Sequence, residues 1–113
     1  MHEYSIVQAL MERVEAEARA RQARKVHRLS VRIGELSGVD VGLLRTAFGI
    51  FRQRTICEHA DLDVQPVVAR WQCPSCSGPI PRGEMLRCPN CRAPAELIEG
   101  GEIVLDRIEM EVP

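Results

Sequence analysis

The chain has 113 residues and a mass of 12.7 kDa, which allows one ordinary domain or a small domain with a smaller appendage and excludes two full-sized domains. With 45% hydrophobic and 27% charged residues, the composition is that of a water-soluble globular protein, and no apolar run approaches the ~18 residues of a membrane span. The formal net charge is −1 and aromatic residues make up 4%, so the chain as a whole lacks the basic, aromatic-rich surface typical of nucleic-acid binding.

The N-terminal segment indicates a cytoplasmic protein. Its first 24 residues include four glutamates and no apolar core, whereas a signal peptide has such a core and a transit peptide nearly lacks acidic residues. We therefore expect a cytoplasmic location and no membrane partner.

Residues 6–24 have the periodicity of an amphipathic helix. Apolar side chains recur along one side of it, at Val7, Leu10, Val14 and Ala18. Ser5 and Gln8 have the spacing of a capping box, in which the serine hydroxyl accepts an amide hydrogen bond at the start of a helix. We expect the helix to begin after Ser5.

The period changes to two over residues 26–33, which predicts a strand. One face carries Leu29, Val31 and Ile33, and the other carries Arg28, Ser30 and Arg32. His27 falls in register with Leu29 and Val31, so we expect it to be partly buried at the end of the strand.

A turn at residues 34–38 leads to a second predicted helix, which Asp40 can cap and which ends near Arg54. The side chains expected to pack inward are Val41, Leu44, Phe48 and Phe51, with Leu43, Ala47 and Ile50 widening the apolar stripe.

Two further strands are predicted, at residues 62–71 and 103–112. Pro66 lacks an amide hydrogen, which indicates an edge position or a bulge in the first of them. The elements together predict an α+β fold, with two helices packed on a small mixed or antiparallel sheet.

Between these strands, residues 72–95 contain five prolines, two glycines and four cysteines and show neither helical nor strand periodicity. Because strand sequence resumes after Gly100 and Gly101, this segment is predicted to be an insertion, a zinc-ribbon-like knuckle unit. The predicted domains are residues 1–69 plus 100–113, and an inserted domain at residues 70–99.

Four of the five cysteines form two Cys-x-x-Cys hooks, Cys73/Cys76 and Cys88/Cys91, separated by eleven residues. Four thiolates form a closed tetrahedral shell around zinc and leave no position for water, so such a site is structural. Iron in rubredoxin-like ligation and a redox dithiol pair are the alternatives. The few apolar residues nearby imply that the metal holds the segment together.

Residues 70–92 carry four arginines against Glu84, a balance that also occurs in zinc ribbons that bind nucleic acid. Zinc with four thiolates contributes about −2 and leaves about +1. Solvated charge or a surface for an acidic protein explains these arginines equally well, so no nucleic-acid partner is expected.

His2 suggests a second metal site. A free α-amine, the backbone nitrogens of residues 2 and 3 and Nδ1 of His2 can present four nitrogens in a plane, with the Glu3 carboxylate adding a nearby anion. Such coordination suits Ni(II) and Cu(II). Taken alone, a histidine at position 2 favours metal binding only weakly.

The remaining polar residues give weaker indications. Cys57 and His59 share a predicted loop with Glu58 and Asp61, which is a poor basis for another metal site. No Gly-rich phosphate loop, Ser/His/Asp set or paired carboxylate arrangement occurs, so the chain is not expected to be an enzyme.

The whole pattern closely resembles the HypA/HybF family of hydrogenase nickel-incorporation proteins. The motifs that carry the resemblance are the opening segment 1–5, the segment 34–37, the two cysteine hooks, the segment 96–102, and Ile108 with Glu109.

This resemblance implies a metallochaperone that delivers nickel, as transient cargo, to the large subunit of a NiFe hydrogenase. The implied partners are the GTPase HypB and, in some organisms, urease accessory proteins. The implied nickel ligands are Met1, His2 and Glu3, the first and last through backbone nitrogen, and the implied zinc ligands are Cys73, Cys76, Cys88 and Cys91.

Overall fold

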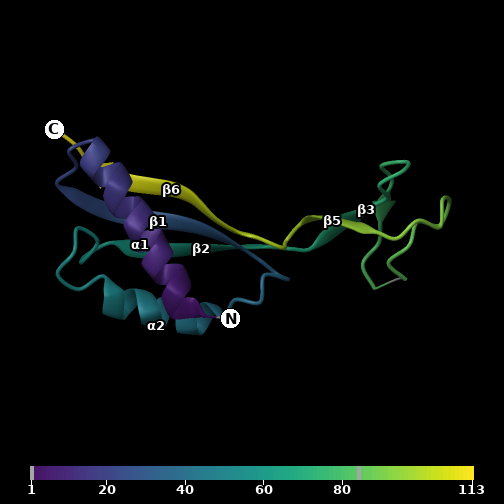
Figure 1. The fold of residues 1–113 in the computed structure, drawn as a ribbon, viewed down its shortest axis with the longest axis horizontal. Coiled ribbons are helices and arrows are strands. Elements are labelled where there is room, and N and C mark those ends of the chain that lie inside the picture. Colours follow the sequence, from purple (N-terminus) through teal and green to yellow (C-terminus); the bar gives the residue numbers. More distant parts are fainter. Residues whose placement is uncertain (1, 84) are drawn as a thin grey trace.

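The computed structural model describes residues 2–83 and 85–113. The molecule is elongated, measuring 55 × 28 × 17 Å, with a three-stranded sheet toward each end (Figure 1). Its radius of gyration is 17.9 Å, whereas a compact chain of this length has a radius of gyration of ~13 Å. The difference reflects the separation of the two sheets along the long axis.

The larger part, called here the two-helix unit, contains α1 (Glu3–Ala20), α2 (Val41–Phe51) and a sheet of β1 (Lys25–Gly34), β2 (Asp61–Val67) and β6 (Ile103–Glu111). The sheet order is β2-β1-β6, and β1 runs parallel to β2 and antiparallel to β6. The predicted α+β fold, with two helices on a small mixed sheet, is confirmed.

Both helices and all three strands share one apolar core. Most of the side chains predicted to face inward are buried: Val7, Val14, Ala18, Leu29, Val31, Ile33, Leu44, Ala47 and Phe48. Leu43 and Ile50 were expected to widen the inner stripe of α2, and that expectation is wrong, because they are 50% and 52% exposed. The sheet and α1 cover only one side of this helix. Neither of the described helices is long and apolar enough to cross a membrane.

The start of α1 differs from the prediction. The helix begins at Glu3, and His2, not Ser5, occupies the N-cap position, with no side-chain capping bond. The Glu3 carboxylate accepts a hydrogen bond from the Asp40 amide (3.0 Å), and an anion in the first turn is favoured by the helix dipole. This carboxylate stabilises the early start, which the spacing of Ser5 and Gln8 did not predict.

The predicted burial of His27 is also wrong. Its side chain is 48% exposed, and its Nε2 lies 3.5 Å from Oε1 of Glu111. The pairing of β1 with β6 shifts register between Val26 and Arg28, so the strict alternation fails at this end. Val26 is fully buried in place of His27.

The single strand predicted at residues 62–71 is two strands. β2 ends at Val67 and lies at an edge of its sheet, as Pro66 predicted, and the chain then crosses to β3 (Arg70–Gln72) in the second sheet. Polar residues occupy odd positions in β2 (Asp63 and Gln65) and even positions in β3 (Arg70 and Gln72), so the alternation changes phase across the apolar run 66–69 that joins the two strands.

The smaller part, called here the cysteine unit, spans residues 70–99. Its sheet has the order β4-β3-β5, with β4 at Pro79–Ile80 and β5 at Glu96–Glu99. Its core is small: Cys73, Ile80 and Cys88, packed by Trp71, Ala93 and Ala95. So little apolar burial is a weak basis for independent folding.

Candidate metal centres

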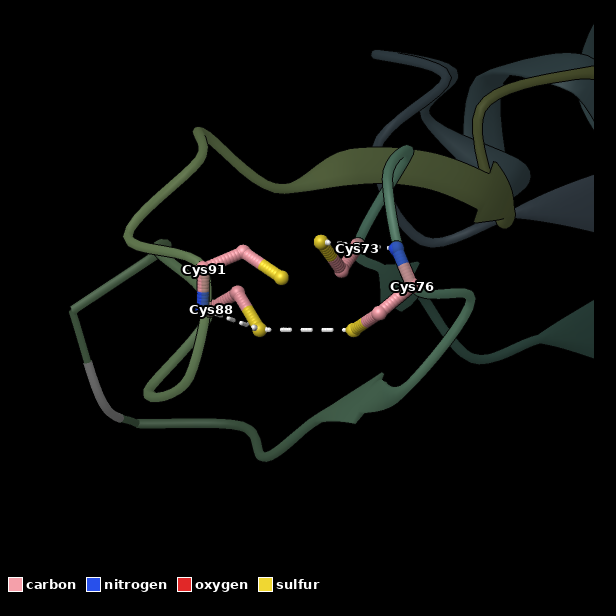
Figure 2. Close-up of side chains that lie close together, drawn as sticks. All are labelled: Cys73, Cys76, Cys88 and Cys91. Carbon is pink, nitrogen blue, oxygen red and sulfur yellow. Dashed lines mark hydrogen bonds between the residues drawn. The ribbon is translucent and has the colours of Figure 1, made fainter.

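The four cysteines of the two hooks converge in the cysteine unit. Their sulfur atoms point into a shared space (Figure 2) and all lie within 4.8 Å of one another. Sulfur atoms bound at ~2.3 Å around a tetrahedral ion are ~3.8 Å apart, and the Sγ atoms of Cys76 and Cys88 are 3.7 Å apart. The cluster therefore has the size of a four-thiolate metal site.

The two hooks have the same backbone geometry. In the first, the Ser77 amide donates to the Cys73 carbonyl (2.9 Å), and in the second the Arg92 amide donates to the Cys88 carbonyl (2.8 Å). Ser77 and Arg92 have positive φ values of 60° and 57°. Each turn thus brings both of its cysteines to the same side.

Hydrogen bonding perturbs the thiols in opposite directions. Sγ of Cys73 accepts from the amides of Cys76 (3.5 Å) and Ser75 (3.4 Å), and these bonds lower the pKa of Cys73 to about 7. Hydrogen bonding to the sulfurs of Cys76 and Cys73 raises the pKa of Cys91 to about 12. Thiols this close cannot all ionise without a cation among them, which is the condition that a bound divalent metal satisfies.

A metal held by all four sulfurs would have no open coordination position, so the arrangement suits a structural role. Among the residues that the structure describes, this cluster is the only one that brings together three or more metal-binding side chains. Few apolar side chains are buried in the cysteine unit, so little else stabilises its fold. The four thiol donors and the distances between their sulfur atoms both fit a tetrahedral ion that prefers thiolate ligands.

The three residues expected to bind nickel lie at the start of α1, apart from the cysteines. Met1 falls outside the described residues. His2 is exposed, and its carbonyl accepts from the Ile6 amide (3.1 Å). Glu3 is 5% exposed, and its hydrogen bond from the Asp40 amide lowers the pKa of its carboxyl group. This anchoring of the Glu3 side chain was not predicted, although an acidic residue beside a helix start was a usable signal.

Comparison with known proteins decides the family. A family model described as hydrogenase/urease nickel incorporation, metallochaperone, HypA, matches residues 1–110. The chain belongs to the HypA family. One relative, hydrogenase maturation factor HypA of Wolinella succinogenes, is 40% identical over 98% of this chain and 96% of its own length. The same factor of Aquifex aeolicus is 36% identical over 99% of both chains.

Solved structures of the HypA family have the same fold. The solution structure of the nickel metallochaperone HypA from Helicobacter pylori covers all of both chains, with 32% identity and a TM-score of 0.76. A second solution structure of a HypA protein covers 97% of this chain and 96% of its own, with 33% identity and a TM-score of 0.81. The HypA family is described as a family of metallochaperones, which is consistent with the expectation that the chain is not an enzyme.

Cys57 and His59 do not form another metal site with their neighbours in the described part of this HypA-family chain. Cys57 is fully buried in the core of the two-helix unit, and burial raises the pKa of its thiol to about 11. It is a small apolar core residue and a poor metal ligand.

Proposed function

We propose that this chain is a nickel metallochaperone that binds Ni(II) through Met1, His2 and Glu3 and delivers it to the large subunit of a NiFe hydrogenase. The observation that carries the proposal is the match of the HypA family model to residues 1–110, which include the terminal histidine motif. The name of the relatives, hydrogenase maturation factor, supports hydrogenase as the recipient.

The proposed chelate uses the α-amine, the amide nitrogens of His2 and Glu3, and Nδ1 of His2. The first amides of an α-helix have no acceptor four residues earlier, so deprotonating these two breaks no bond of the helical ladder. Four nitrogens in a plane satisfy the preference of Ni(II). Because the ligands precede or begin α1, nickel can leave without unfolding the core.

We further propose that zinc occupies the four-cysteine cluster as a structural ion. Cys73, Cys76, Cys88 and Cys91 would hold it, and it would supply no reactive coordination position. The geometry that supports zinc is the spread of sulfurs within 4.8 Å. On this view residues 1–69 with 100–113 form a nickel-binding domain, and residues 70–99 form an inserted zinc-binding domain.

The proposed partners are the GTPase HypB and the hydrogenase large subunit in the cytoplasm. Urease accessory proteins are a second class of partner, which the hydrogenase/urease description of the family supports.

The test of the terminal chelate is a nickel titration of the untagged protein, the protein acetylated at its α-amine, and the protein extended by a few residues before Met1. Acetylation and extension each remove one nitrogen donor without altering a side chain. We expect both to weaken nickel binding strongly and to leave the zinc content unchanged. In the untagged form, affinity should fall steeply from about pH 8 to pH 6, because protons compete with nickel for amine and imidazole nitrogens.

Equal nickel affinity in all three forms would exclude the terminal chelate. Zinc content, measured in each sample by metal analysis, shows whether the cysteine unit stayed intact.

A further inference from the structure

One ion pair joins the two units across 47 residues of sequence. Glu35 follows β1 in the two-helix unit, and Arg82 follows β4 in the cysteine unit. Nη1 of Arg82 donates to Oε1 of Glu35 and Nη2 donates to Oε2, both at 2.7 Å. This two-point geometry fixes direction as well as distance, because the guanidinium and carboxylate planes must align.

The same two side chains also contact the backbone between the units. The Ala69 amide donates to Oε1 of Glu35 (2.8 Å), and Nη1 of Arg82 lies 3.4 Å from the Ala69 carbonyl oxygen. Ala69 is 1% exposed and lies between β2 and β3. Glu35 and Arg82 therefore meet on the segment about which one unit would turn relative to the other.

That junction is narrow (Figure 1). The chain passes between the units at residues 68–69 and at residues 100–102. The backbone there is anchored to the two-helix unit by hydrogen bonds from the Glu35 amide to the Val67 carbonyl (2.8 Å) and from the Leu36 amide to the Gly100 carbonyl (2.7 Å). The extensive packing between helices and strands lies within each unit.

We infer that Glu35 and Arg82 form a latch that fixes the orientation of the cysteine unit relative to the two-helix unit. The backbone anchors reach only the base of the cysteine unit. Arg82 belongs to the turn after β4 and to neither crossing segment, so its contact with Glu35 beside Ala69 adds a third connection between the units. A two-point ion pair with aligned planes resists rotation about the crossing segments, which alone act as a hinge.

The latch acts on orientation more than on stability. Its side chains are 54% and 39% exposed, and exposed ion pairs contribute little to the free energy of unfolding. The hydrogen bonds from Arg82 and from the Ala69 amide lower the pKa of Glu35 to about 2. The carboxylate therefore remains ionised at neutral and mildly acidic pH, and protonation of Glu35 does not open the latch there.

The test uses residual dipolar couplings of backbone amides in the zinc-loaded full chain, fitted separately for the two units. Arg82→Gln and Glu35→Gln each remove one charge of the latch. Arg87→Gln is the matched control, since it removes an arginine of the same unit whose hydrogen bond to the Arg92 carbonyl (3.1 Å) stays inside that unit. Arg82→Lys retains the positive charge but loses the planar guanidinium that donates two parallel hydrogen bonds.

We expect the native protein and Arg87→Gln to give one alignment tensor for both units. Arg82→Gln and Glu35→Gln should give a smaller alignment magnitude for the cysteine unit than for the two-helix unit, with Arg82→Lys in between. Zinc content and amide shifts inside each unit should match the native values. If Arg82→Gln disturbs the zinc site, Glu35→Gln carries the test from outside the cysteine unit. A single tensor in Glu35→Gln, or two tensors in the native protein, would overturn the latch.

Discussion

His2 occupies the N-cap of α1 but makes no side-chain capping bond and is exposed. His2→Ala should therefore change the free energy of unfolding by less than about 0.5 kcal/mol. We expect the same substitution to abolish high-affinity nickel binding, because it removes the imidazole donor of the proposed chelate. Nickel titration and urea unfolding, each on the zinc-loaded chain, measure the two effects.

The other two histidines are matched controls for this prediction. His27 and His59 are both exposed, so their replacement by alanine also leaves the fold intact. Neither should weaken nickel binding. Loss of binding in His59→Ala with retention in His2→Ala would move the nickel site to the loop that contains Cys57.

At the level of single residues, spacing in the sequence was a sound guide wherever chemistry requires a fixed interval. The two Cys-x-x-Cys hooks identified all four members of the cluster, since a metal site needs that local geometry. The contact between Glu3 and Asp40 spans 37 residues, and no periodic pattern encodes it. Glu35 and Arg82 were likewise unpredictable as partners, because their meeting depends on how the two sheets are joined.

At the level of elements, we expect the folding of the cysteine unit to depend on its metal and the folding of the two-helix unit not to. Cys73→Ala and Cys91→Ala each remove one of four thiolates, so both variants should lose zinc. Apparent binding free energies of structural zinc sites are about 10–16 kcal/mol, and the cysteine unit has only a few buried apolar side chains to replace that contribution. We expect the amide resonances of the cysteine unit to move toward random-coil chemical shifts in both variants.

The two-helix unit should remain folded in these variants, since its core contains no residue of the hooks. Amide hydrogen exchange resolves the two units separately, with Cys57→Ala as a cysteine control that spares zinc. Normal zinc content in Cys73→Ala or Cys91→Ala would contradict the four-cysteine assignment.

The element boundaries show where periodicity fails. Residues 62–71 are strand-like in composition throughout, yet β2 and β3 belong to different sheets. The apolar run 66–69 that joins them has the composition of a strand, although the alternation of polar residues changes phase across it. The register shift between Val26 and Arg28 has the same consequence, since a bulge exchanges inner and outer faces without altering the composition of the strand.

At the scale of the whole molecule, three backbone segments meet where the units join. A Cβ atom on Gly34 would lie 2.3 Å from the Gly100 carbonyl carbon, and one on Gly100 would lie 2.5 Å from Cα of Ala69. Gly100 also has a φ of +93°, which L-residues with a side chain rarely adopt. Glycine at these positions therefore allows the crossing segments to pack closely enough for Glu35, Ala69 and Arg82 to meet.

Gly100→Ala should consequently destabilise the zinc-loaded chain by more than about 1 kcal/mol, because backbone has to move and the positive φ becomes strained. Gly49→Ala is the matched control. Gly49 lies inside α2, and no atom beyond its chain neighbours and the backbone of its own helix lies within 4 Å of an added Cβ. Alanine there should therefore stabilise the chain by about 0.5–1 kcal/mol through helix propensity. Urea unfolding followed by circular dichroism compares the two, with residual dipolar couplings reporting the orientation of the units. The prediction would be contradicted if Gly100→Ala unfolded at the same urea concentration as the native protein and its two units still shared one alignment tensor. The close approach of the three segments would then not be required for the junction.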